Sequence, residues 1–526
     1  MNVKQSKITE ILRAGFTALN EGNAKRAAEC CRAAMSLDRA NPEVHFLVGL
    51  VALDMNDLKT AASAFGSVTK LSKNHAAAWA QLARIFMRMG QPARAEQALS
   101  KATDAGTDDP AVEDLIGVVA SLLGNQHDAK KWYKRAVQKA PERAAYAVNL
   151  ASAQIFLGET DEAEATLKTL LDRNDNIAQA EWLLSSLRKA ETPARADALL
   201  KKAEAAKDPH SKAFLGYAAG KEFEDCEVWD KAFRAFSLGA AAKRSTLTFD
   251  EAKEEAMFAA LEDSFTEEWA ARAGGGHHDP APIFVVGQPR TGTTLIERII
   301  TSHSAVESAG ELQQFGLSIH RLTEGSFSDR LSPEAIRASA KINPTDLGRE
   351  YLRASAPMRK DAERFVDKLP GNYLHLPLIL KALPDARIIH LTRHPMDSCF
   401  ASYKQLFAEA YFHSYDQEEM ARHHLRYANL MARWRERFPG RFLDISYEDT
   451  VADHEPNARR LIEFLGLDWE DACLEFHTQK AAVATASAVQ VREKPHQRSV
   501  GRWRRYQDKL VPMQTILRDG GLELDS

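Results

Sequence analysis

The stretch FVVGQPRTGTT, residues 284–294, contains residue types that bind phosphate groups. Four residues separate Gly287 from Gly292, and Thr293 and Thr294 follow directly. This is the spacing of the loop G-x-x-x-x-G-K-[ST], except that Thr293 replaces the lysine. The backbone N–H groups that open the helix after such a loop bind anions, and the helix dipole adds to the attraction. The stretch therefore predicts an anion-binding loop, with an ordinary glycine turn as the alternative.

The missing lysine argues against a nucleoside triphosphate as the ligand of this loop. In enzymes that act on triphosphates, that lysine stabilises the β- and γ-phosphates, and the residue after it holds Mg²⁺. The cation of this loop is Arg290 instead, and Thr291, Thr293 and Thr294 add hydroxyl donors. We therefore expect a nucleotide with fewer phosphates at its 5′ end, and no obligatory metal.

Several segments in the second half of the chain resemble sulfotransferases that use 3′-phosphoadenosine-5′-phosphosulfate. In this family, a loop similar to PRTGTT (289–294) holds the 5′-phosphosulfate. The resemblance continues in SAGEL (308–312), VDKLPGN (366–372), LTRHPMDSCFASY (391–403), SYED (446–449), TASAVQVREK (485–494) and GRWRRY (501–506). The first two of these are similar to segments of tyrosylprotein sulfotransferases. The resemblance covers about residues 282–510, and it implies a sulfuryl transfer.

The resemblance assigns a role to each matching residue. The residues it places around the 5′-phosphosulfate are Arg290, Thr291, Gly292, Thr293 and Thr294. It makes Glu311 the general base for the acceptor hydroxyl, and Lys368 and Arg290 the cations that neutralise charge on the transferring group and the leaving phosphate. The other expected donor contacts are Arg393, Ser402 and Arg502 at the 3′-phosphate, Tyr447, and Ser487, which is also expected near the transferring group.

One position departs from the pattern of the family. The family usually has a serine eight residues after the arginine of the 3′-phosphate site, and this chain has Ala401 there, followed by Ser402. Either Ser402 replaces that serine, or one hydrogen bond to the 3′-phosphate is missing. Arg393 itself has a structural alternative, an ion pair with Asp397.

The chemistry of sulfuryl transfer fits these residue types. Like phosphoryl transfer, it passes through a loose, in-line transition state, so catalysis is mostly positioning and cations aimed at developing charge. The match of Glu311 and Lys368 implies protein tyrosine as the acceptor, while a carbohydrate or a small metabolite stays open. A metal-dependent kinase or NTPase, and an adaptor whose nucleotide-binding domain is inactive, are the competing classes.

The first third of the chain contains a repeat of 34 residues. Its turn position is occupied by Gly22, Asn56, Gly90, Gly124 and Gly158. Five residues after each comes alanine, and seven before each comes glycine or alanine, so pairs of helices can approach closely. The period resembles the tetratricopeptide repeat, with five copies over residues 8–175. Such stacks bind extended peptides, so we expect the repeats to recruit a protein or peptide acceptor.

The remaining pattern predicts the domain organisation. Residues 1–265 are expected to form an α-solenoid, with a degenerate helix pair over 214–236, and the glycine-rich stretch within 266–282 reads as a linker. Short apolar runs then alternate with helical stretches over 283–526. They predict a P-loop-type parallel-sheet α/β domain, with ligands at the carboxyl ends of its strands. The expected fold class is thus α plus α/β.

Composition excludes some partners and settings. The chain of 526 residues has a net charge of −4 and ordinary hydrophobic and charged fractions, which argues against nucleic acid or a membrane surface as partner. No apolar run approaches 18 residues, and the start MNVKQSKITEILRAG lacks a signal-peptide core. The five cysteines do not suggest a disulfide framework, so we expect a cytoplasmic protein. A homo-oligomer is left open.

Overall fold

The computed structural model describes residues 3–272, 274–323, 327, 329–407, 410–479, 481–485 and 487–525. They form two compact units, which divide between Ala153 and Gln154. Within the described residues, no helix is long and apolar enough to cross a membrane. The cytoplasmic location stays a prediction.

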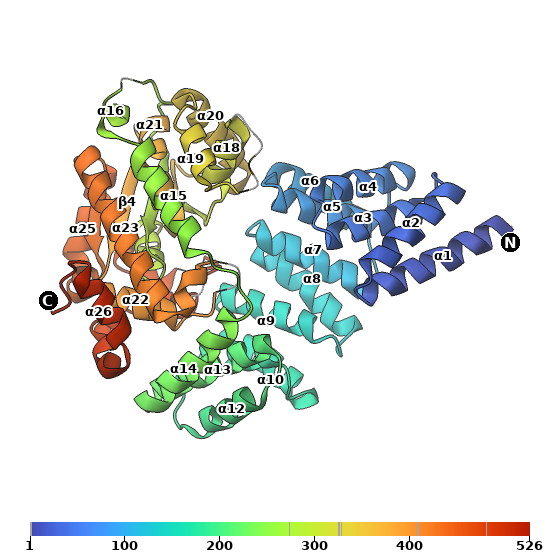
Figure 1. The fold of residues 1–526 in the computed structure, drawn as a ribbon, viewed down its shortest axis with the longest axis horizontal. Helices are drawn as coiled ribbons and strands as arrows, with labels where there is room; N and C mark the ends of the chain where they lie inside the picture. Colours follow the sequence, from blue (N-terminus) through green and yellow to red (C-terminus); the bar gives the residue numbers. More distant parts are fainter. Residues whose placement is uncertain are drawn as a thin grey trace. The chain divides into compact units, whose positions relative to one another are not determined.

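The repeat region folds into the predicted five helix pairs, and Figure 1 shows helices of the first pairs lying side by side. The pairs are α1 Val3–Asn20 with α2 Ala24–Leu37, α3 Pro42–Asp54 with α4 Leu58–Leu71, α5 Ala76–Arg88 with α6 Pro92–Ala105, α7 Pro110–Leu122 with α8 Gln126–Lys139, and α9 Ala144–Leu157 with α10 Thr160–Arg173. All five turn residues at the 34-residue spacing have positive φ, between 58° and 86°. Glycine adopts this conformation without a steric penalty, which explains its recurrence there.

The small residues of the repeat allow close helix contact, as predicted. A Cβ atom on Gly49 would lie 2.6 Å from the Phe65 ring, and one on Gly117 would lie 2.7 Å from the Tyr133 ring. Each glycine is in the first helix of a pair and each ring is in the second, so the ring fills the space that a side chain would need. Both rings are buried, which makes these contacts part of the core of the first unit.

Four further helices follow the repeats: α11 Ala178–Leu187, α12 Ala194–Ala205, α13 Pro209–Asp225 and α14 Trp229–Arg244. The last two form the helix pair predicted at 214–236, and Gly216 and Gly239 let them touch through their backbones. This pair belongs to the second unit, because Tyr217 donates a hydrogen bond to the Tyr403 carbonyl (3.0 Å) and Phe236 shares a hydrophobic cluster with that region. The predicted linker range contains α16 Glu267–Ala271, which follows α15 Glu251–Ser264. The domain boundary at residue 265 stays a prediction.

The second unit contains a parallel sheet of five strands in the order β2-β3-β1-β4-β5. The strands are β1 Pro282–Gly287, β2 Val306–Gly310, β3 Arg364–Asp367, β4 Arg387–Thr392 and β5 Leu443–Ser446. The α-helices that follow β1 are α17 Thr293–Ile300, α18 Gln314–Leu322, α19 Pro333–Ser339, α20 Pro344–Ser355, α21 Leu376–Ala382, α22 Pro395–Tyr403, α23 Gln417–Arg437, α24 Tyr447–Ala452, α25 His454–Leu465 and α26 Val511–Asp519. Short 3-10 helices complete the unit: η1 Ala356–Met358, η2 Pro370–His375, η3 Phe412–Tyr415, η4 Asp471–Cys473, η5 Phe476–Thr478, η6 Gln490–Arg492, η7 Gln497–Ser499 and η8 Arg502–Lys509.

Helices cover both faces of the sheet, which explains why its central strand is apolar throughout. Phe284 and Val286 of β1 pack in a cluster with α15 and α23, which cross the sheet in Figure 1. Ile283 and Val285 point to the opposite face and pack with α17 and α25. Alternate side chains of a strand face opposite sides, so a strand buried on both sides needs an unbroken apolar run. The predicted fold class is confirmed.

Candidate active site

Each strand of the sheet ends immediately before a segment that the sequence singled out. The strand ends are Gly287, Gly310, Asp367, Thr392 and Ser446. The residues that follow them are Gln288, Glu311, Lys368, Arg393 and Tyr447. Because the strands are parallel, these residues all lie at one edge of the sheet, where open α/β sheets bind ligands.

The loop between β1 and α17 has a backbone that requires its two glycines. Gly287 has φ 150°, and a Cβ atom there would lie 2.9 Å from the Leu391 carbonyl oxygen. Gly292 has φ 100°, and a Cβ atom there would lie 2.6 Å from the Tyr447 ring. The Thr291 hydroxyl donates to the Gln288 carbonyl (2.8 Å) and closes the loop on itself. The conformation of this loop is therefore fixed by its two glycines and by the Thr291 hydrogen bond, and the Tyr447 ring packs against it at Gly292.

Thr293 and Thr294 are the first two residues of α17, with Gly292 as the N-cap. Both side chains are nearly buried, and neither hydroxyl has a hydrogen-bond partner among the described residues. The free N–H groups of a helix start and two free hydroxyls at the same place suit an anion. That both threonines bind the 5′-phosphosulfate stays a prediction.

Arg290 connects the loop to the late segment that contains Ser487. Its guanidinium donates to the Ser487 hydroxyl (2.6 Å) and to the Gln490 side-chain oxygen (3.1 Å). Burial, and then the charge of Arg393, lower the pKa of Arg290 to about 10. Arg290 therefore keeps its positive charge at neutral pH, in a place where it is repelled by another cation and would be relieved by an anion.

Arg393 lies at the centre of the candidate site. Its guanidinium donates to the carbonyls of Arg290 (2.6 Å) and Ser499 (2.7 Å) and lies 4.5 Å from the centre of the Tyr447 ring. Its Nε atom is buried without a partner. No ion pair joins Arg393 to Asp397 in the part of the chain that the structure describes, because the Asp397 carboxylate accepts the N–H groups of the 501–503 turn instead. The positive charge of Arg393 is thus not neutralised by an ion pair with Asp397.

The two other residues predicted at the 3′-phosphate have protein contacts of their own. The fully buried Ser402 donates to the Pro289 carbonyl (3.3 Å), so it supports the backbone of the phosphate loop. Arg502 packs over the Trp229 ring at 5.2 Å and forms an ion pair with Glu224 at 3.5 Å. It lines a hollow of about 550 Å³ that also contains Arg498, Arg504 and Arg505.

Lys404 is a cation of this region that the sequence analysis missed. It caps α22 and pairs with Glu224 at 2.6 Å. Burial lowers the pKa of Lys404, Glu224 opposes this, and the charges of Arg502 and Arg393 lower it further. The charges of Glu224, Arg502 and Arg393 therefore all act on Lys404, which no local spacing in the sequence reveals.

Glu311 and Lys368 form an ion pair at the ends of the neighbouring strands β2 and β3. The side chain of Lys368 is 1% exposed and that of Glu311 is 44% exposed, so the carboxylate faces outward and the ammonium lies beneath it. On its other side, the ammonium lies 3.8 Å from the Oε2 atom of Glu297. The Oε1 atom of Glu297 accepts a hydrogen bond from the Ser308 hydroxyl (2.6 Å). Burial raises the pKa of Glu297, and the charge of Lys368 opposes this. Glu297 was not predicted, because on α17 it lies between Ile296 and Arg298 and belongs to no motif.

Tyr411 is a third residue that the sequence did not indicate. It has left-handed backbone angles (φ 56°, ψ 49°), which is unusual for an aromatic residue, and its ring packs edge-on against Phe407. Burial, and then the negative charge of Glu311, raise the pKa of its phenol. The Tyr411 phenol is thus close enough to Glu311, the expected base, for the carboxylate charge to act on it.

Asp367, the last residue of β3, gives a testable pH dependence. It accepts hydrogen bonds from the Tyr351 hydroxyl (2.9 Å) and the Leu312 N–H (3.4 Å), and burial raises its pKa to about 8 despite them. The native state therefore keeps a proton that the unfolded chain releases near pH 4, and stability falls by about 1.4 kcal/mol per pH unit between these values. In Asp367→Asn this contribution disappears. Urea unfolding of the sheet-containing unit at pH 5 and pH 7.5 should show a flatter pH dependence in the variant; equal slopes in both proteins would contradict the assignment.

Glu254, His413 and His423 come close to a metal-ligand set, with ligand atoms within 4.8 Å of one another. The two imidazole rings are stacked at 3.5 Å with their planes 12° apart, so their in-plane lone pairs do not converge on one ion. Arg426 already donates to the Glu254 carboxylate (2.6 Å). His423 also reaches the side chain of the loop residue Gln288 (3.2 Å). The cluster therefore serves to hold the loop by hydrogen bonds, and the expectation that the site needs no metal stays a prediction.

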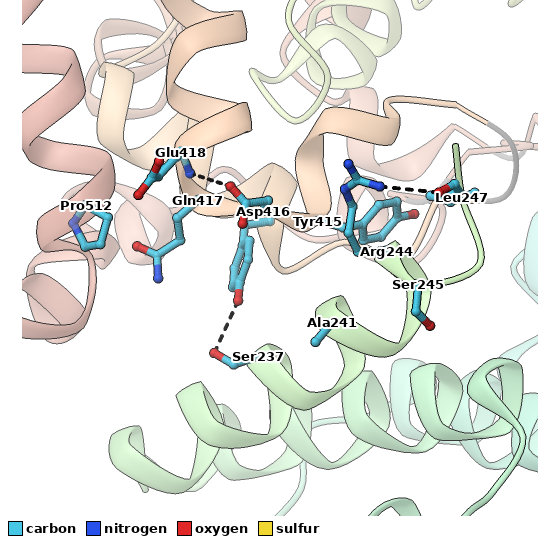
Figure 2. Close-up of a pocket in the computed structure, with 11 residues that line it drawn as sticks. Ser237, Ala241, Arg244, Ser245, Leu247, Tyr415, Asp416, Gln417, Glu418 and Pro512 are labelled. Carbon is cyan, nitrogen blue, oxygen red and sulfur yellow. Dashed lines mark hydrogen bonds between the residues drawn. The ribbon is translucent and has the colours of Figure 1, made fainter. Parts of the chain in front are cut away.

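A hollow of about 690 Å³ lies between α14 and the start of α23 (Figure 2). Several of its polar groups pair with one another: Ser237 accepts from Tyr403 (3.2 Å), Arg244 donates to the Leu247 carbonyl (3.3 Å), and Asp416 accepts the Glu418 N–H (2.9 Å). It contains none of the predicted site residues. The candidate active site is thus the edge of the sheet, and not this hollow.

Two protein-family models match this chain. Residues 282–471 match the model of the sulfotransferase family, and residues 52–118 and 123–185 match that of the tetratricopeptide repeat. Over 323 residues the chain is 32% identical to an uncharacterized protein of Aquifex aeolicus (strain VF5). The match covers 60% of this chain but only 42% of that protein. It is 24% identical to a "Putative protein-tyrosine sulfotransferase" of Caenorhabditis briggsae, over 37% of this chain and 69% of that one.

Among solved structures, the sulfotransferase domain from the Synechococcus PCC 7002 olefin synthase is 20% identical. The match covers 48% of this chain and 98% of that domain, with a TM-score of 0.33. The chain joins tetratricopeptide repeats, matched within residues 52–185, to a domain of the sulfotransferase family, matched over residues 282–471.

Proposed function

We propose that this protein transfers a sulfuryl group from 3′-phosphoadenosine-5′-phosphosulfate to a hydroxyl group, with a protein tyrosine as the acceptor. The observation that supports this best is the Glu311–Lys368 pair beside the loop of β1. A half-exposed carboxylate and a buried ammonium lie at the ends of two neighbouring strands, and the next strand ends in an anion-binding loop. A base, a cation and a donor site are thus arranged in a row along one edge of the sheet.

The groups that would bind the donor are available. The unpartnered hydroxyls of Thr293 and Thr294 and the start of α17 suit the 5′-phosphosulfate, and Arg290 lies beside them. The buried, unpartnered Nε of Arg393 suits a further anion, the 3′-phosphate. Tyr447 would cover this part of the donor, because its ring already packs on both Gly292 and Arg393. Ser402 would act through the loop backbone, and Arg502 through the arginine-lined hollow.

The proposed reaction is one in-line displacement at sulfur. The acceptor oxygen forms a bond to sulfur while its proton passes to the Glu311 carboxylate. The bond between sulfur and the 5′-phosphate oxygen breaks, and its electron pair stays on the phosphate. Arg290, Lys368 and Ser487 would lie around the transferring group, where charge moves from the acceptor side to the phosphate side. These fixed cations replace the metal that triphosphate chemistry uses.

Lys368 would exchange partners during this reaction. In the structure its ammonium contacts Glu311, and an anionic donor would compete for it. Glu297 lies on the far side at 3.8 Å and would keep a carboxylate next to the ammonium throughout. An ammonium that remains charged in a buried place needs such a partner.

A protein acceptor is supported by the repeats, since stacked helix pairs bind extended peptides. The similarity to the C. briggsae protein points to tyrosine. The test is to incubate the full chain with donor carrying a radiolabelled sulfuryl group and an extract from cells that lack this protein. Label on a tyrosine residue of a protein band supports the proposal. Label on a carbohydrate or small molecule would overturn the protein acceptor, and donor binding without any transfer would favour the adaptor.

A further inference from the structure

The late segment that contacts Arg290 is fastened to the rest of the unit through a few backbone atoms. Arg298 of α17 donates to the Ala481 carbonyl (3.3 Å), and Arg492 at the other end of the segment, in η6, donates to the same carbonyl (3.4 Å). Between these attachment points lie Ser487 and Gln490, whose oxygens accept from Arg290. The position of the Arg290 guanidinium therefore depends on where this segment is held.

The late segment is also attached to the last turn of α9. The Phe156 carbonyl accepts two hydrogen bonds from the segment, one from the Val483 N–H (2.9 Å) and one from the Arg492 guanidinium (3.0 Å). Phe156 lies beyond Gln154, in the same compact unit as the sheet. One carbonyl at the end of a repeat helix thus holds both ends of the segment that lies against the sulfuryl site.

Gly158 provides the space for this contact. It has φ 79°, and a Cβ atom on it would lie 2.7 Å from both Cζ and Nε of Arg492. The equivalent turn residue one repeat earlier, Gly124, has φ 86°, but a Cβ atom there would meet nothing within 4 Å. The repeat pattern explains glycine at both positions by backbone conformation. Only at Gly158 does a second requirement exist, the flat packing of the Arg492 guanidinium on the turn.

We infer that Arg492 is a positioning residue for the sulfuryl site, and that the turn Phe156–Gly158 of the fifth repeat forms part of that site's support. The inference rests on the proposed function, because it assumes that Arg290 and Ser487 contact the transferring group. Three contacts connect the turn to the site. The turn holds Arg492, and the hydrogen bonds of Arg492 and Val483 to Phe156 hold the segment. Ser487 and Gln490 of that segment in turn hold Arg290. This turn is then a structural component of catalysis, in addition to any role of the repeats in recruitment.

The test uses two glycine variants that differ only in this contact. Gly158→Ala and Gly124→Ala both place a side chain at a positive φ and should lower thermal stability by similar amounts. Gly158→Ala should also displace Arg492 and lower kcat by about 10- to 100-fold, which is the cost of a small misplacement at a reacting centre. Gly124→Ala should keep the kcat of the native chain. Arg492→Ala should match Gly158→Ala, and the double variant should be no worse than either single one. Arg492→Lys should recover part of the activity, since it restores one donor to Phe156.

Hydrogen–deuterium exchange of the full chain gives a readout that does not need activity. The Val483 amide should exchange faster in Gly158→Ala and Arg492→Ala, and at the native rate in Gly124→Ala. If both variants keep native exchange and native kcat while the native chain is active, the inference is wrong. If the native chain neither binds the donor nor transfers from it, the proposed function fails instead; the exchange pattern then still decides whether Arg492 holds the segment, and an unchanged Val483 rate overturns that as well.

Discussion

Glu311→Gln is expected to lower kcat by about 100- to 10,000-fold, the usual contribution of a general base. Glutamine has nearly the same shape and still offers an oxygen to the Lys368 ammonium, but it does not take up the acceptor proton. The proposed donor site is the loop of β1 and not Glu311, so donor affinity should stay within about twofold of the native value. Single-turnover rates with excess enzyme, together with equilibrium binding of the donor, measure both quantities.

The matched control for this variant is Glu307→Gln. Glu307 lies on the same strand four residues earlier, and its carboxylate accepts the Lys360 N–H (2.6 Å), which a glutamine oxygen also does. This variant should keep the native kcat. Full activity of Glu311→Gln would show that the acceptor proton leaves by another route. A parallel loss in both glutamine variants would point to a general effect of altered charge on β2.

Arg393→Ala is expected to weaken donor binding by about 10- to 100-fold, because a hydrogen bond to a charged group contributes about 1.5–3 kcal/mol. The kcat at saturating donor should change much less, since Arg393 would contact the 3′-phosphate and not the transferring group. Arg393 also holds the Arg290 and Ser499 carbonyls, so a loss of affinity alone does not identify its ligand.

A comparison of two nucleotides separates these roles. The native chain should bind 3′,5′-adenosine bisphosphate more tightly than adenosine 5′-phosphate, and Arg393→Ala should bind both alike. Arg387→Ala is the control, because Arg387 begins the same strand at its opposite, exposed end. It should preserve the preference. A variant at Arg393 that is weaker for both nucleotides but still prefers the 3′-phosphate would assign that phosphate to another cation, such as Arg502.

Local patterns in the sequence predicted the parts of the fold with local causes. The repeat of turn residues specified five helix pairs, since each pair needs a positive-φ turn and a small residue at a fixed spacing. The strand-loop-helix unit around Gly287 and Gly292 has the same local character. The expected gathering of Glu311 and Lys368 is present because both directly follow parallel strands.

The residues that sequence reasoning missed act through distant contacts. Glu297 is a buried charge on α17, and only the fold brings Lys368 to it. Lys404 interacts with Arg393 through space and with Glu224 of the earlier helix pair. Arg492 and Phe156 are 336 residues apart, and no spacing in a single sequence connects them. Distant contacts also place the helices after the repeats in the same unit as the sheet. The hydrogen bond from Tyr217 to the Tyr403 carbonyl is one example.

One measurement tests the central claim most directly. The purified full chain is mixed with a tyrosine-containing peptide and either the phosphosulfate donor labelled in its sulfuryl group, or ATP labelled at the γ-phosphate with Mg²⁺, each with and without EDTA. The account predicts that label passes to the tyrosine from the sulfate donor at a rate that EDTA does not change, and that none passes from ATP. Transfer from ATP that requires Mg²⁺, with no transfer from the sulfate donor, would contradict it.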